Sequence, residues 1–586
     1  MLLEHREKSL ESILSVQEDT ARPVCEEPSV VADEDWIEKF YDEITGTQLN
    51  SESVREARAD EIRFIKKFDV WTVGSRPSKG SGYTVVRGRW VDVNKGDSEK
   101  PNYRSRYVGQ EIKKGVKTAF VSEFFAAMPP LSSSKFLLIL AVTKTFPGID
   151  QIPITIEDKV VLFVDVKRAH FVSAAQRKIC VELPKELRRE GVDEVGYLNK
   201  AMYGTRDAAF CWSMEVVRFF VTKLGFVQGL ANPCHFYHHE RQIRAGIHGD
   251  DVEALGAYDE IVKLKDEIQE EWEIVVRGIL GPPGRQGTTT TVRHLNRLIT
   301  WDNCGITWEC DPRHVDLIVN DLGLSKGKSV TSPLVRDPVG APEDDPDEEV
   351  CLDEEEKKQY QSNTMRLGYI SHDRPDLQRT VRELAKGMQS PQRHHLTKLK
   401  RCARYLKYAP RCVQRLAYQS SIKCIDAYTD SDYAGCIRTR KSTTGVVIML
   451  GTSMSKSTCR GQGVPSLSVG ESEYYGLVSG ACEALGERSY GLDLGVKLEI
   501  KVWMDSTTGA AIGSRQGLGK LKHVDVRFLW VQDYTRRKEI SIWKVHTSLN
   551  FADILTKAIS AMILRAVMIK LGFDFPPGRS SAAYKA

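Results

Sequence analysis

The sequence lacks the cysteine patterns of a zinc site or of a disulfide framework. Its 13 cysteines are scattered, with no C-x-x-C pair and no Cys/His cluster at zinc-ligand spacing. Scattered free thiols are typical of a reducing compartment. We therefore expect an intracellular protein, most simply a cytoplasmic one, with the nucleus as an alternative.

Long apolar runs are missing as well. The longest, residues 136–142, is far shorter than the roughly 20 residues of a membrane span, and the first residues lack the apolar core of a signal peptide. Neither sign of charge dominates, because 83 Lys and Arg stand against 79 Asp and Glu, a net charge of +4. Composition therefore predicts a globular protein without a membrane partner, and only the local distribution of charge can indicate a nucleic-acid binder.

The chain is too long for a single hydrophobic core. Its 586 residues predict about three or four domains. Residues 1–50 are acidic, polar and weakly periodic, which indicates a tail. Residues 336–358 form an acidic, proline-containing stretch that can bury little, which predicts a linker. Between these two segments short apolar strands alternate with helical stretches, an α+β pattern.

A basic stretch follows the linker. Residues 359–415 predict helices, with Pro375 and Pro391 at helix starts. From Arg393 to Arg415 this region carries Lys and Arg but no acid. A solvated helix face and a surface that follows phosphates are both consistent with such charge. The candidates for phosphate contact are Lys398, Lys400, Arg401, Arg404 and Lys407.

Two segments place carboxylates next to apolar strands. Asp165 ends the apolar run Val160-Val-Leu-Phe-Val, and Asp250 and Asp251 follow Gly249 between apolar flanks, which predicts a hairpin with acids at its turn. Nucleotidyl transfer requires two Mg²⁺ ions about 3.5–4 Å apart, held by carboxylate oxygens. Gly-Asp-Asp alone is also a common turn sequence, so its neighbours decide between the two interpretations.

Those neighbours resemble the reverse transcriptase of copia-type LTR retrotransposon Pol polyproteins. Asp165-Val-Lys-Arg-Ala-His170 is similar to that family's Asp-Val-Lys-Thr-Ala-Phe, and Tyr103-Arg-Ser-Arg-Tyr-Val108 is similar to its Tyr-Lys-Ala-Arg-Leu-Val. Lys200-Ala-Met-Tyr-Gly-Thr-Arg-Asp-Ala-Ala-Phe-Cys-Trp212 resembles Lys-Ala-Leu-Tyr-Gly-Leu-Lys-Gln-Ala-Pro-Arg-Ala-Trp. The blocks Thr331-Ser-Pro-Leu334, Arg374-Pro-Asp376 and Arg404-Tyr-Leu-Lys407 follow in the family's order. The resemblance extends from about residue 55 to 560.

The resemblance implies roles for particular residues. Asp165, Asp250 and Asp251 would hold the metal ions. Arg104 and Arg106 would lie over the incoming triphosphate, which suits a guanidinium fork, although an exposed strand face would explain these two arginines as well.

This chain departs from the family near the nucleotide. His170 stands where the family has an aromatic residue that blocks a ribose 2′-hydroxyl, and Asp207 stands where it has a glutamine that touches the nucleotide. His248-Gly249 replaces Tyr-Val before the two aspartates. These changes leave the three expected metal ligands in place.

A second set of acids lies near the C-terminus. Asp430 and Asp505 each end an apolar strand, and Glu471 and Asp553 each open a helix. Two strand ends and two helix starts can gather at one edge of a sheet. Helix N-termini also favour anions, so capping alone would explain Glu471 and Asp553.

The order of these acids resembles the ribonuclease H module of the same polyproteins. Tyr428-Thr-Asp-Ser-Asp-Tyr-Ala-Gly435 is similar to Tyr-Ser-Asp-Ala-Asp-Trp-Ala-Gly, and Lys522-His-Val-Asp-Val-Arg527 is similar to Lys-His-Ile-Asp-Ile-Arg. The resemblance implies that two Mg²⁺ ions are bound by Asp430, Glu471, Asp505 and Asp553, with Asp432 and Glu473 in support. His523 and Arg527 become candidates for contact with a hybrid backbone, and a plain surface role is equally consistent.

The implied fold class is mixed α+β. We expect a right-hand polymerase with reverse transcriptase fingers and palm at residues 55–335 and basic, thumb- or connection-like helices at 359–415. A ribonuclease H-like α/β domain would follow at 421–560, with a C-terminal tail at 561–586.

The implied activity is RNA-directed DNA polymerase, a nucleotidyltransferase, combined with ribonuclease H. Mg²⁺ would be the cofactor, two ions per active site, with Mn²⁺ as a substitute. RNA template, DNA primer, dNTPs and RNA–DNA hybrid would be the partners, and the oligomeric state stays open. Integrase, protease and capsid signatures are missing, so we expect a fragment of a longer polyprotein or a separate reading frame. Two alternatives remain: a decayed or repurposed remnant that binds nucleic acid without polymerising, and a nuclease-only protein.

Overall fold

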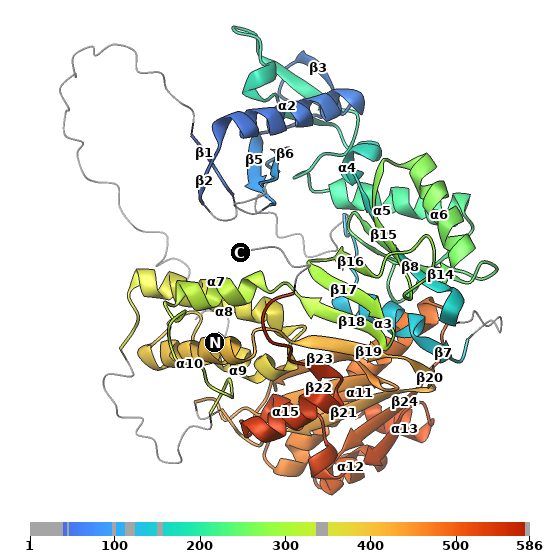
Figure 1. The fold of residues 1–586 in the computed structure, drawn as a ribbon, viewed down its shortest axis with the longest axis vertical. Coiled ribbons are helices and arrows are strands. Elements are labelled where there is room, and N and C mark those ends of the chain that lie inside the picture. The colour runs from blue at the N-terminus through green and yellow to red at the C-terminus, as the bar shows by residue number, and fades with distance from the viewer. Residues whose placement is uncertain are drawn as a thin grey trace.

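The computed structural model describes residues 39–43, 46–96, 101–111, 124–148, 156–335, 350–436 and 438–580. Most of the predicted N-terminal tail and the first part of the predicted linker, residues 336–349, lie outside these ranges. Figure 1 shows the chain passing from an N-terminal lobe, through a central sheet and a group of helices, to a C-terminal lobe. Among the described residues no helix is both long and apolar enough to cross a bilayer, and every described cysteine is a free thiol.

The N-terminal lobe combines one long helix with small sheets. Helix α2 (Ser51–Lys67) begins at Asn50, whose side chain accepts a hydrogen bond from the Ser53 backbone N–H. It packs on strand β6 (Tyr103–Gly109), which forms an antiparallel hairpin with β5 (Gly88–Asn94). The remaining strands of this lobe are β1 (Phe40–Tyr41), β2 (Gln48–Leu49), β3 (Trp71–Ser75), β4 (Thr84–Val86), β9 (Ile179–Glu182) and β10 (Glu194–Leu198).

The palm is a six-stranded sheet in the order β11-β12-β13-β14-β8-β15. Strand β8 (Lys159–Val166) sends Val160 and Val164 into a core with α5 (Ala208–Val217) and α6 (Tyr258–Glu271), and it sends Phe163 into a second core with α3 (Leu131–Ala141). Both faces of β8 are buried, which explains its continuous apolar sequence. The other palm elements are β7 (Thr143–Thr145), α4 (Ala169–Val172), β11 (Val227–Gln228), β12 (His235–His238), β13 (Ile243–His248), β14 (Asp251–Ala257) and β15 (Ile274–Leu280).

A second sheet joins the palm to the helical region. Its five strands run in the order β16-β17-β18-β19-β26. The adjoining helices bury a core that contains Tyr360, Leu377 and Leu399. The elements are β16 (Thr291–His294), β17 (Arg297–Asp302), β18 (Gly305–Cys310), β19 (Val413–Ala417), β26 (Phe573–Asp574), α7 (Arg313–Asp321), α8 (Glu354–Ser371), α9 (Pro375–Ala385) and α10 (Arg393–Tyr408).

The C-terminal lobe is a mixed five-stranded sheet in the order β23-β22-β21-β24-β25. Strand β21 is antiparallel to β22 and parallel to β24, and the long helix α11 packs across them. The elements are β20 (Gln419–Ser421), β21 (Cys424–Ser431), β22 (Thr443–Leu450), β23 (Ser453–Gly461), α11 (Val469–Asp493), β24 (Glu499–Met504), α12 (Thr507–Ser514), α13 (Trp530–Arg536), β25 (Ser541–Lys544), α14 (Asp553–Thr556) and α15 (Ala561–Lys570). The mixed α+β class expected from the sequence is confirmed.

Two predicted boundaries are wrong. The expected C-terminal tail contains α15, which buries Leu564 and Met568, and β26, which pairs with β19. The helices after the linker begin at Glu354, inside the segment assigned to the linker, because the side chain of Asp353 accepts hydrogen bonds from the Glu355 and Glu356 N–H groups and starts α8.

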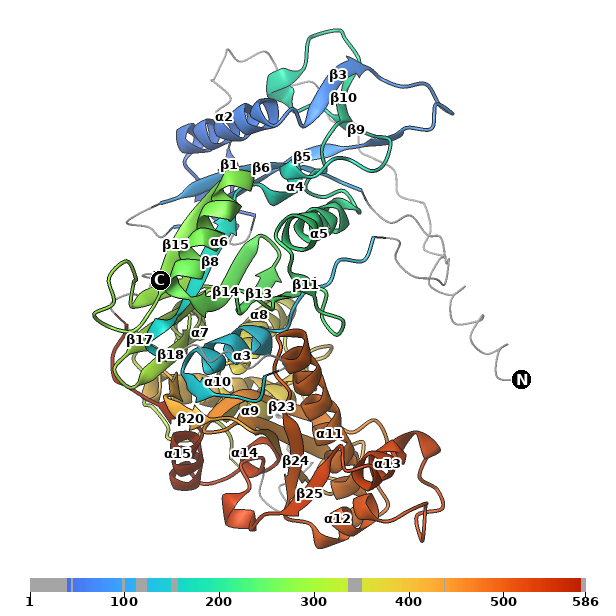
Figure 2. The ribbon, with the colours of Figure 1, turned by 90° about the vertical axis from the view of Figure 1, so that its right-hand side faces the viewer.

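The palm and the C-terminal lobe share one hydrophobic core. Helix α3 is buried from Ser132 to Ala141, and its side chains join Trp301 and Trp308 of the second sheet to Leu477 of α11. Figure 2 shows α3 between the palm strands and α11. At the end of α11 the Asp493 carboxylate accepts backbone N–H bonds from Leu230, Ala231 and Asn232, at 2.8, 3.1 and 2.8 Å. The two lobes are therefore fastened by both apolar packing and charge-assisted hydrogen bonds.

Candidate catalytic sites

Strand pairing brings the first set of acids to one edge of the palm sheet. Asp165 near the end of β8 lies directly opposite Asp251 at the start of β14, and Asp250 lies in the turn between β13 and β14. Gly249 takes a φ of +68° in this turn, and its carbonyl oxygen accepts a 2.7 Å hydrogen bond from the Trp212 indole. The β13–β14 hairpin predicted from the sequence is thus present, with all three acids at its turn end.

The electrostatics of this edge suit a cation. Burial raises the pKa of Asp251, and the charges of Asp250 and Asp165 raise it further, although His294 and Arg277 oppose them. Its Oδ1 atom is buried without a hydrogen-bond donor. A nitrogen of Arg277 lies 2.9 Å from Asp165 Oδ2 and 3.2 Å from Asp251 Oδ1. Carboxylate oxygens gathered from two strands are ligands that suit a divalent ion.

The two fingers arginines face this edge from strand β6. Arg104 and Arg106 are two residues apart and so point to the same side of the strand. The Asp165 charge acts on Arg104, whose pKa is nevertheless lowered by burial and by Arg106. The Arg106 guanidinium lies 4.5 Å from the ring centre of Tyr203. Both are therefore placed between the fingers and the palm acids, where a triphosphate would need positive charge.

His170 lies near both the palm acids and the fingers arginines, because the charges of Asp250 and Arg106 act on its ring. Its ring contacts Tyr203 edge-on, with ring centres 4.7 Å apart, and burial lowers its pKa to about 4 despite the charge of Asp250. The neutral imidazole thus occupies the aromatic position with a flat, apolar-facing ring.

Asp207 does not face the nucleotide side as a free carboxylate. It is buried, and its Oδ1 accepts a 2.7 Å hydrogen bond from Arg177, which also forms two bonds with Glu111 at 2.8 and 2.7 Å. Burial would raise the Asp207 pKa, but the Arg177 guanidinium lowers it below its usual value. An ion pair with Arg177 thus holds the Asp207 carboxylate, and contact of Asp207 with a nucleotide stays a prediction.

The second set of acids gathers more tightly. Asp430, Asp505 and Asp553 each offer a carboxylate oxygen within 4.8 Å of the others, which is a geometry able to hold a metal ion. No comparably tight trio occurs at the palm turn within the described part of the chain. Burial and Asp430 raise the pKa of Asp553 to about 6. The Lys557 ammonium lies 3.2 Å from Asp430 Oδ1 and 3.0 Å from Asp553 Oδ1, so a cation already contacts this cluster.

Glu473, and not Glu471, is the glutamate that faces these aspartates. Burial, Asp430 and Asp505 together raise the pKa of Glu473 to about 8, and its Oε2 is buried without a hydrogen-bond partner. Glu471 instead accepts hydrogen bonds from the Leu467 N–H and the Tyr475 hydroxyl, both at 2.9 Å, and lies 2.8 Å from His523. The expected roles of the two glutamates are therefore exchanged.

The sequence at the start of α11 indicates the direction in which each of the two glutamates points. Ser468 caps α11 by accepting a bond from the Glu471 N–H, and Ser-Val-Gly-Glu is a capping-box sequence, in which the glutamate folds back over the helix start. Two residues further on, a helix has turned by about 200°. Glu473 therefore points to the opposite side of α11, toward the sheet.

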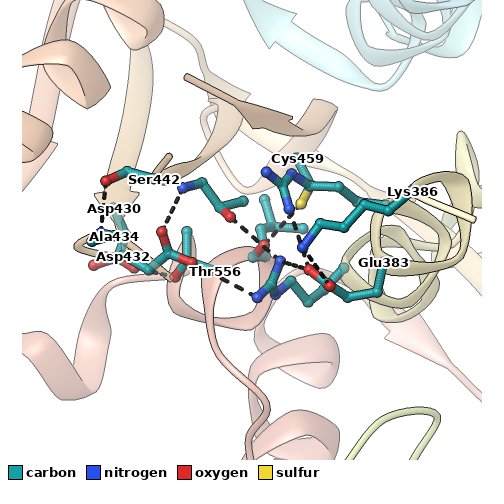
Figure 3. A network of polar contacts seen from close by, with 12 residues as sticks. Glu383, Lys386, Asp430, Asp432, Ala434, Ser442, Cys459 and Thr556 are labelled. Carbon is teal, nitrogen blue, oxygen red and sulfur yellow. Dashed lines mark hydrogen bonds and ion pairs between the residues drawn. The ribbon is translucent and has the colours of Figure 1, made fainter. Parts of the chain in front are cut away.

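Helix α9 packs beside the second acid cluster, and Figure 3 shows the polar contacts between the two. Arg379 of α9 donates to Thr443 Oγ1 at 3.3 Å and lies 3.7 Å from Asp432. Its neighbour Glu383 pairs with Lys386 at 2.6 Å, while Thr556 donates a hydrogen bond to Asp430. Asp432 thus lies in contact with α9, and its supporting role stays a prediction.

The basic residues of α10 differ in their hydrogen bonds within the chain and in their exposure to solvent. The Lys407 ammonium donates to the carbonyls of Leu324 and Ser325 at 2.9 and 2.8 Å, and also to that of Gly327. Arg401 donates to Ser332 Oγ at 3.1 Å. Arg404 is exposed, whereas Lys398 and Lys400 are half-buried. Lys407 is therefore a structural residue and not a free phosphate ligand, and Arg404 remains the most accessible candidate.

His523 and Arg527 lie near the second site. His523 is half-exposed and held by Glu471, while the exposed Arg527 pairs with Asp525 at 3.2 Å. Contact of either residue with nucleic acid stays a prediction.

The chain is similar in sequence to retroelement polyproteins. Residues 68–280 match the family described as reverse transcriptase (RNA-dependent DNA polymerase). The chain is 23% identical over 524 residues to the retrovirus-related Pol polyprotein from transposon TNT 1-94 of Nicotiana tabacum, covering 86% of this chain and 36% of that protein. It is 22% identical over 550 residues to the corresponding polyprotein from transposon RE1 of Arabidopsis thaliana, covering 90% and 34%. The chain thus spans about a third of the length of these curated relatives.

The chain also aligns with solved structures of the foamy viral protease-reverse transcriptase. Its complex with RNA/DNA hybrid aligns with a TM-score of 0.45 and 12% identity, covering 85% of this chain and 54% of that one. Its complex with double-stranded DNA aligns with a TM-score of 0.44 and 11% identity, covering 84% and 70%. Residues 68–280 thus match the reverse transcriptase family, and the chain as a whole is similar to the copia-type, retrovirus-related Pol polyproteins of plant transposons.

Proposed function

We propose that the chain is an RNA-directed DNA polymerase with ribonuclease H activity. The observation that carries the polymerase half is the register pair Asp165–Asp251 beside the Asp250 turn, within residues that match the reverse transcriptase family. The partners would be an RNA template, a DNA primer, dNTPs and the hybrid product. The foamy viral relatives were solved with DNA and with RNA/DNA hybrid, which supports nucleic-acid partners for this fold.

Different residues of the palm and fingers would have separate roles in polymerisation. Asp165, Asp250 and Asp251 would hold two Mg²⁺ ions, or Mn²⁺ in their place, which lower the pKa of the attacking 3′-hydroxyl and neutralise the triphosphate. Arg104 and Arg106 would orient the triphosphate from the fingers, because a guanidinium fork matches phosphate oxygens. His170 and Tyr203 would form the wall beside the ribose.

The C-terminal lobe would cut the RNA strand of the hybrid. Asp430, Asp505 and Asp553 supply oxygens within 4.8 Å of one another, and Glu473 adds a fourth carboxylate whose raised pKa reflects its closeness to Asp430 and Asp505. Lys557 would give up its contacts with Asp430 and Asp553 when a divalent ion takes the same oxygens. Thr556 and Asn550, which donates to the Thr429 carbonyl at 2.9 Å, would keep the strand and α14 aligned.

A nuclease-only protein is the second candidate function. The C-terminal acids are gathered within metal-binding distance, whereas the palm acids are less tightly gathered and carry the Arg277 contact. A remnant that binds nucleic acid without catalysis would show neither activity.

Primer extension on an RNA template with Mg²⁺ and dNTPs tests the polymerase half. The parent protein should extend the primer, and Asp250→Asn should abolish extension. Asp266→Asn, on the outer surface of α6, is the matched control and should retain it. A parent protein that extends no primer but cleaves the hybrid would establish the nuclease-only alternative instead.

A further inference from the structure

A β-bulge in strand β15 places the side chain of Arg277 next to Asp165 and Asp251. Strand β15 pairs with β8 so that Val275 lies opposite Asp165, and the register then shifts between Val276 and Gly278. Arg277 is the extra residue in this bulge. A bulge re-aims the side chain it contains, and here the guanidinium turns toward Asp165 and Asp251.

The neighbouring glycine holds the bulge in place. Gly278 has a φ of +154°, and a Cβ atom there would lie 2.6 Å from Thr289 Cγ2 and 2.9 Å from Val292 Cγ1. Only glycine permits both this backbone conformation and this close approach. The direction of Arg277 is therefore built into the backbone and is not an accident of a flexible side chain.

One guanidinium nitrogen spans carboxylates from two different strands. Arg277 Nη2 lies 2.9 Å from Asp165 Oδ2 and 3.2 Å from Asp251 Oδ1, and its side chain is 36% exposed. Other positive groups act on these acids, namely Arg104 and Lys95 from the fingers and His294 from the second sheet. Arg277 is distinguished from these by direct contact with both acids.

We propose that Arg277 is a built-in counter-cation of the palm acid pair that a divalent ion must displace. An arginine keeps its charge at every physiological pH, so it offsets the negative charge of both carboxylates and holds Asp165 and Asp251 close together. A divalent ion requires the same carboxylate oxygens, and two cations on one oxygen repel each other. Arg277 therefore pre-positions the acids and at the same time raises the metal concentration that the palm site needs. This inference rests on the metal site of the proposed function.

Metal binding, not activity, tests the inference. Mn²⁺ would be titrated into the full chain carrying Asp430→Asn, Asp505→Asn and Asp553→Asn, which removes the three aspartates of the C-terminal cluster. Bound Mn²⁺ would be counted by electron paramagnetic resonance. Adding Arg277→Gln should tighten Mn²⁺ binding at least fivefold, and Arg277→Lys should give an intermediate value. Arg218→Gln, whose guanidinium pairs with Glu215 and Glu271 on the palm surface, should leave the affinity unchanged.

Thermal melting in EDTA supplies a second readout. Arg277→Gln should melt at a lower temperature than its parent, because two acids lose a common counter-charge, and Mn²⁺ should raise its melting temperature by more than it raises that of the parent. Unchanged or weaker Mn²⁺ binding by Arg277→Gln overturns the inference. If Asp250→Asn removes none of the Mn²⁺ signal in either the parent or Arg277→Gln, the palm metal site itself fails, which distinguishes the two outcomes.

Discussion

Neutralising Glu471 and Glu473, the two glutamates nearest the start of α11, is expected to change stability in opposite directions. Burial, Asp430 and Asp505 raise the pKa of Glu473 from 4.5 to about 8. At pH 7 the folded protein therefore bears a cost of about 1.36 kcal/mol for each of about 2.5 pH units, or roughly 3 kcal/mol in metal-free buffer. Glu473→Gln keeps the shape of the side chain and removes this cost, so the variant should melt at a higher temperature.

The pH dependence has a definite sign. Because the folded-state pKa of Glu473 lies above its unfolded value, its contribution to stability is complete below pH 4.5 and is lost as the pH rises through about 8. The wild-type protein in EDTA should therefore lose stability from pH 5 to pH 8. Glu473→Gln should give a flatter profile over the same range.

Glu471→Gln should behave in the opposite way. It weakens a charged acceptor that serves the Leu467 N–H, the Tyr475 hydroxyl and His523, and hydrogen bonds to charged groups contribute about 1.5–3 kcal/mol each. Its melting temperature should fall throughout the range. Hybrid cleavage should be lost in Glu473→Gln and retained, at least in part, in Glu471→Gln. A stabilised Glu471→Gln, or a Glu473→Gln that still cleaves at the wild-type rate, would refute the assignment.

Four further outcomes follow from the geometry. Asp493→Ala should lower the free energy of unfolding by about 2–4 kcal/mol in urea titrations, since three backbone N–H groups lose a charged acceptor; a change under 0.5 kcal/mol would contradict the fastening of palm to C-terminal lobe. Lys407→Ala should lower the melting temperature while hybrid affinity and its salt dependence stay constant, whereas Arg404→Ala should weaken binding and flatten the salt dependence. Arg177→Met should destabilise the chain by about 3–5 kcal/mol, because Asp207 and Glu111 are left without their partner, and Asp207→Asn in the same background should recover part of that loss. Mg²⁺ should raise the melting temperature at pH 8 more in the wild type than in Asp505→Asn.

Much of the architecture could be predicted from local sequence. The apolar run of β8 followed by Asp165, the Gly-Asp-Asp turn and the strand ends at Asp430 and Asp505 each carry a strong local pattern. The folded segment after residue 560 has a weaker local sequence pattern. Strand β26 has two residues and depends on β19 for its pairing, so its stability comes from tertiary contact and not from propensity.

The direction in which a side chain points could not in general be predicted from the sequence. Asp207 and Lys407 occupy positions that suit nucleic-acid contact in sequence, but Arg177 and the carbonyls near Leu324 hold them elsewhere. Arg277 gives no sequence signal, because a β-bulge depends on how two strands pair. The exchange of Glu471 and Glu473 was readable in principle from the capping box at Ser468.

We propose that two separate acid clusters perform two separable reactions in one chain. A hybrid substrate with a labelled DNA primer and a differently labelled RNA template would report extension and RNA cleavage in one reaction with Mg²⁺ and dNTPs. Asp250→Asn should cleave the RNA without extending the primer, Asp505→Asn should extend without cleaving, and the parent should do both. Loss of both reactions in either variant, or loss of neither, would contradict the account.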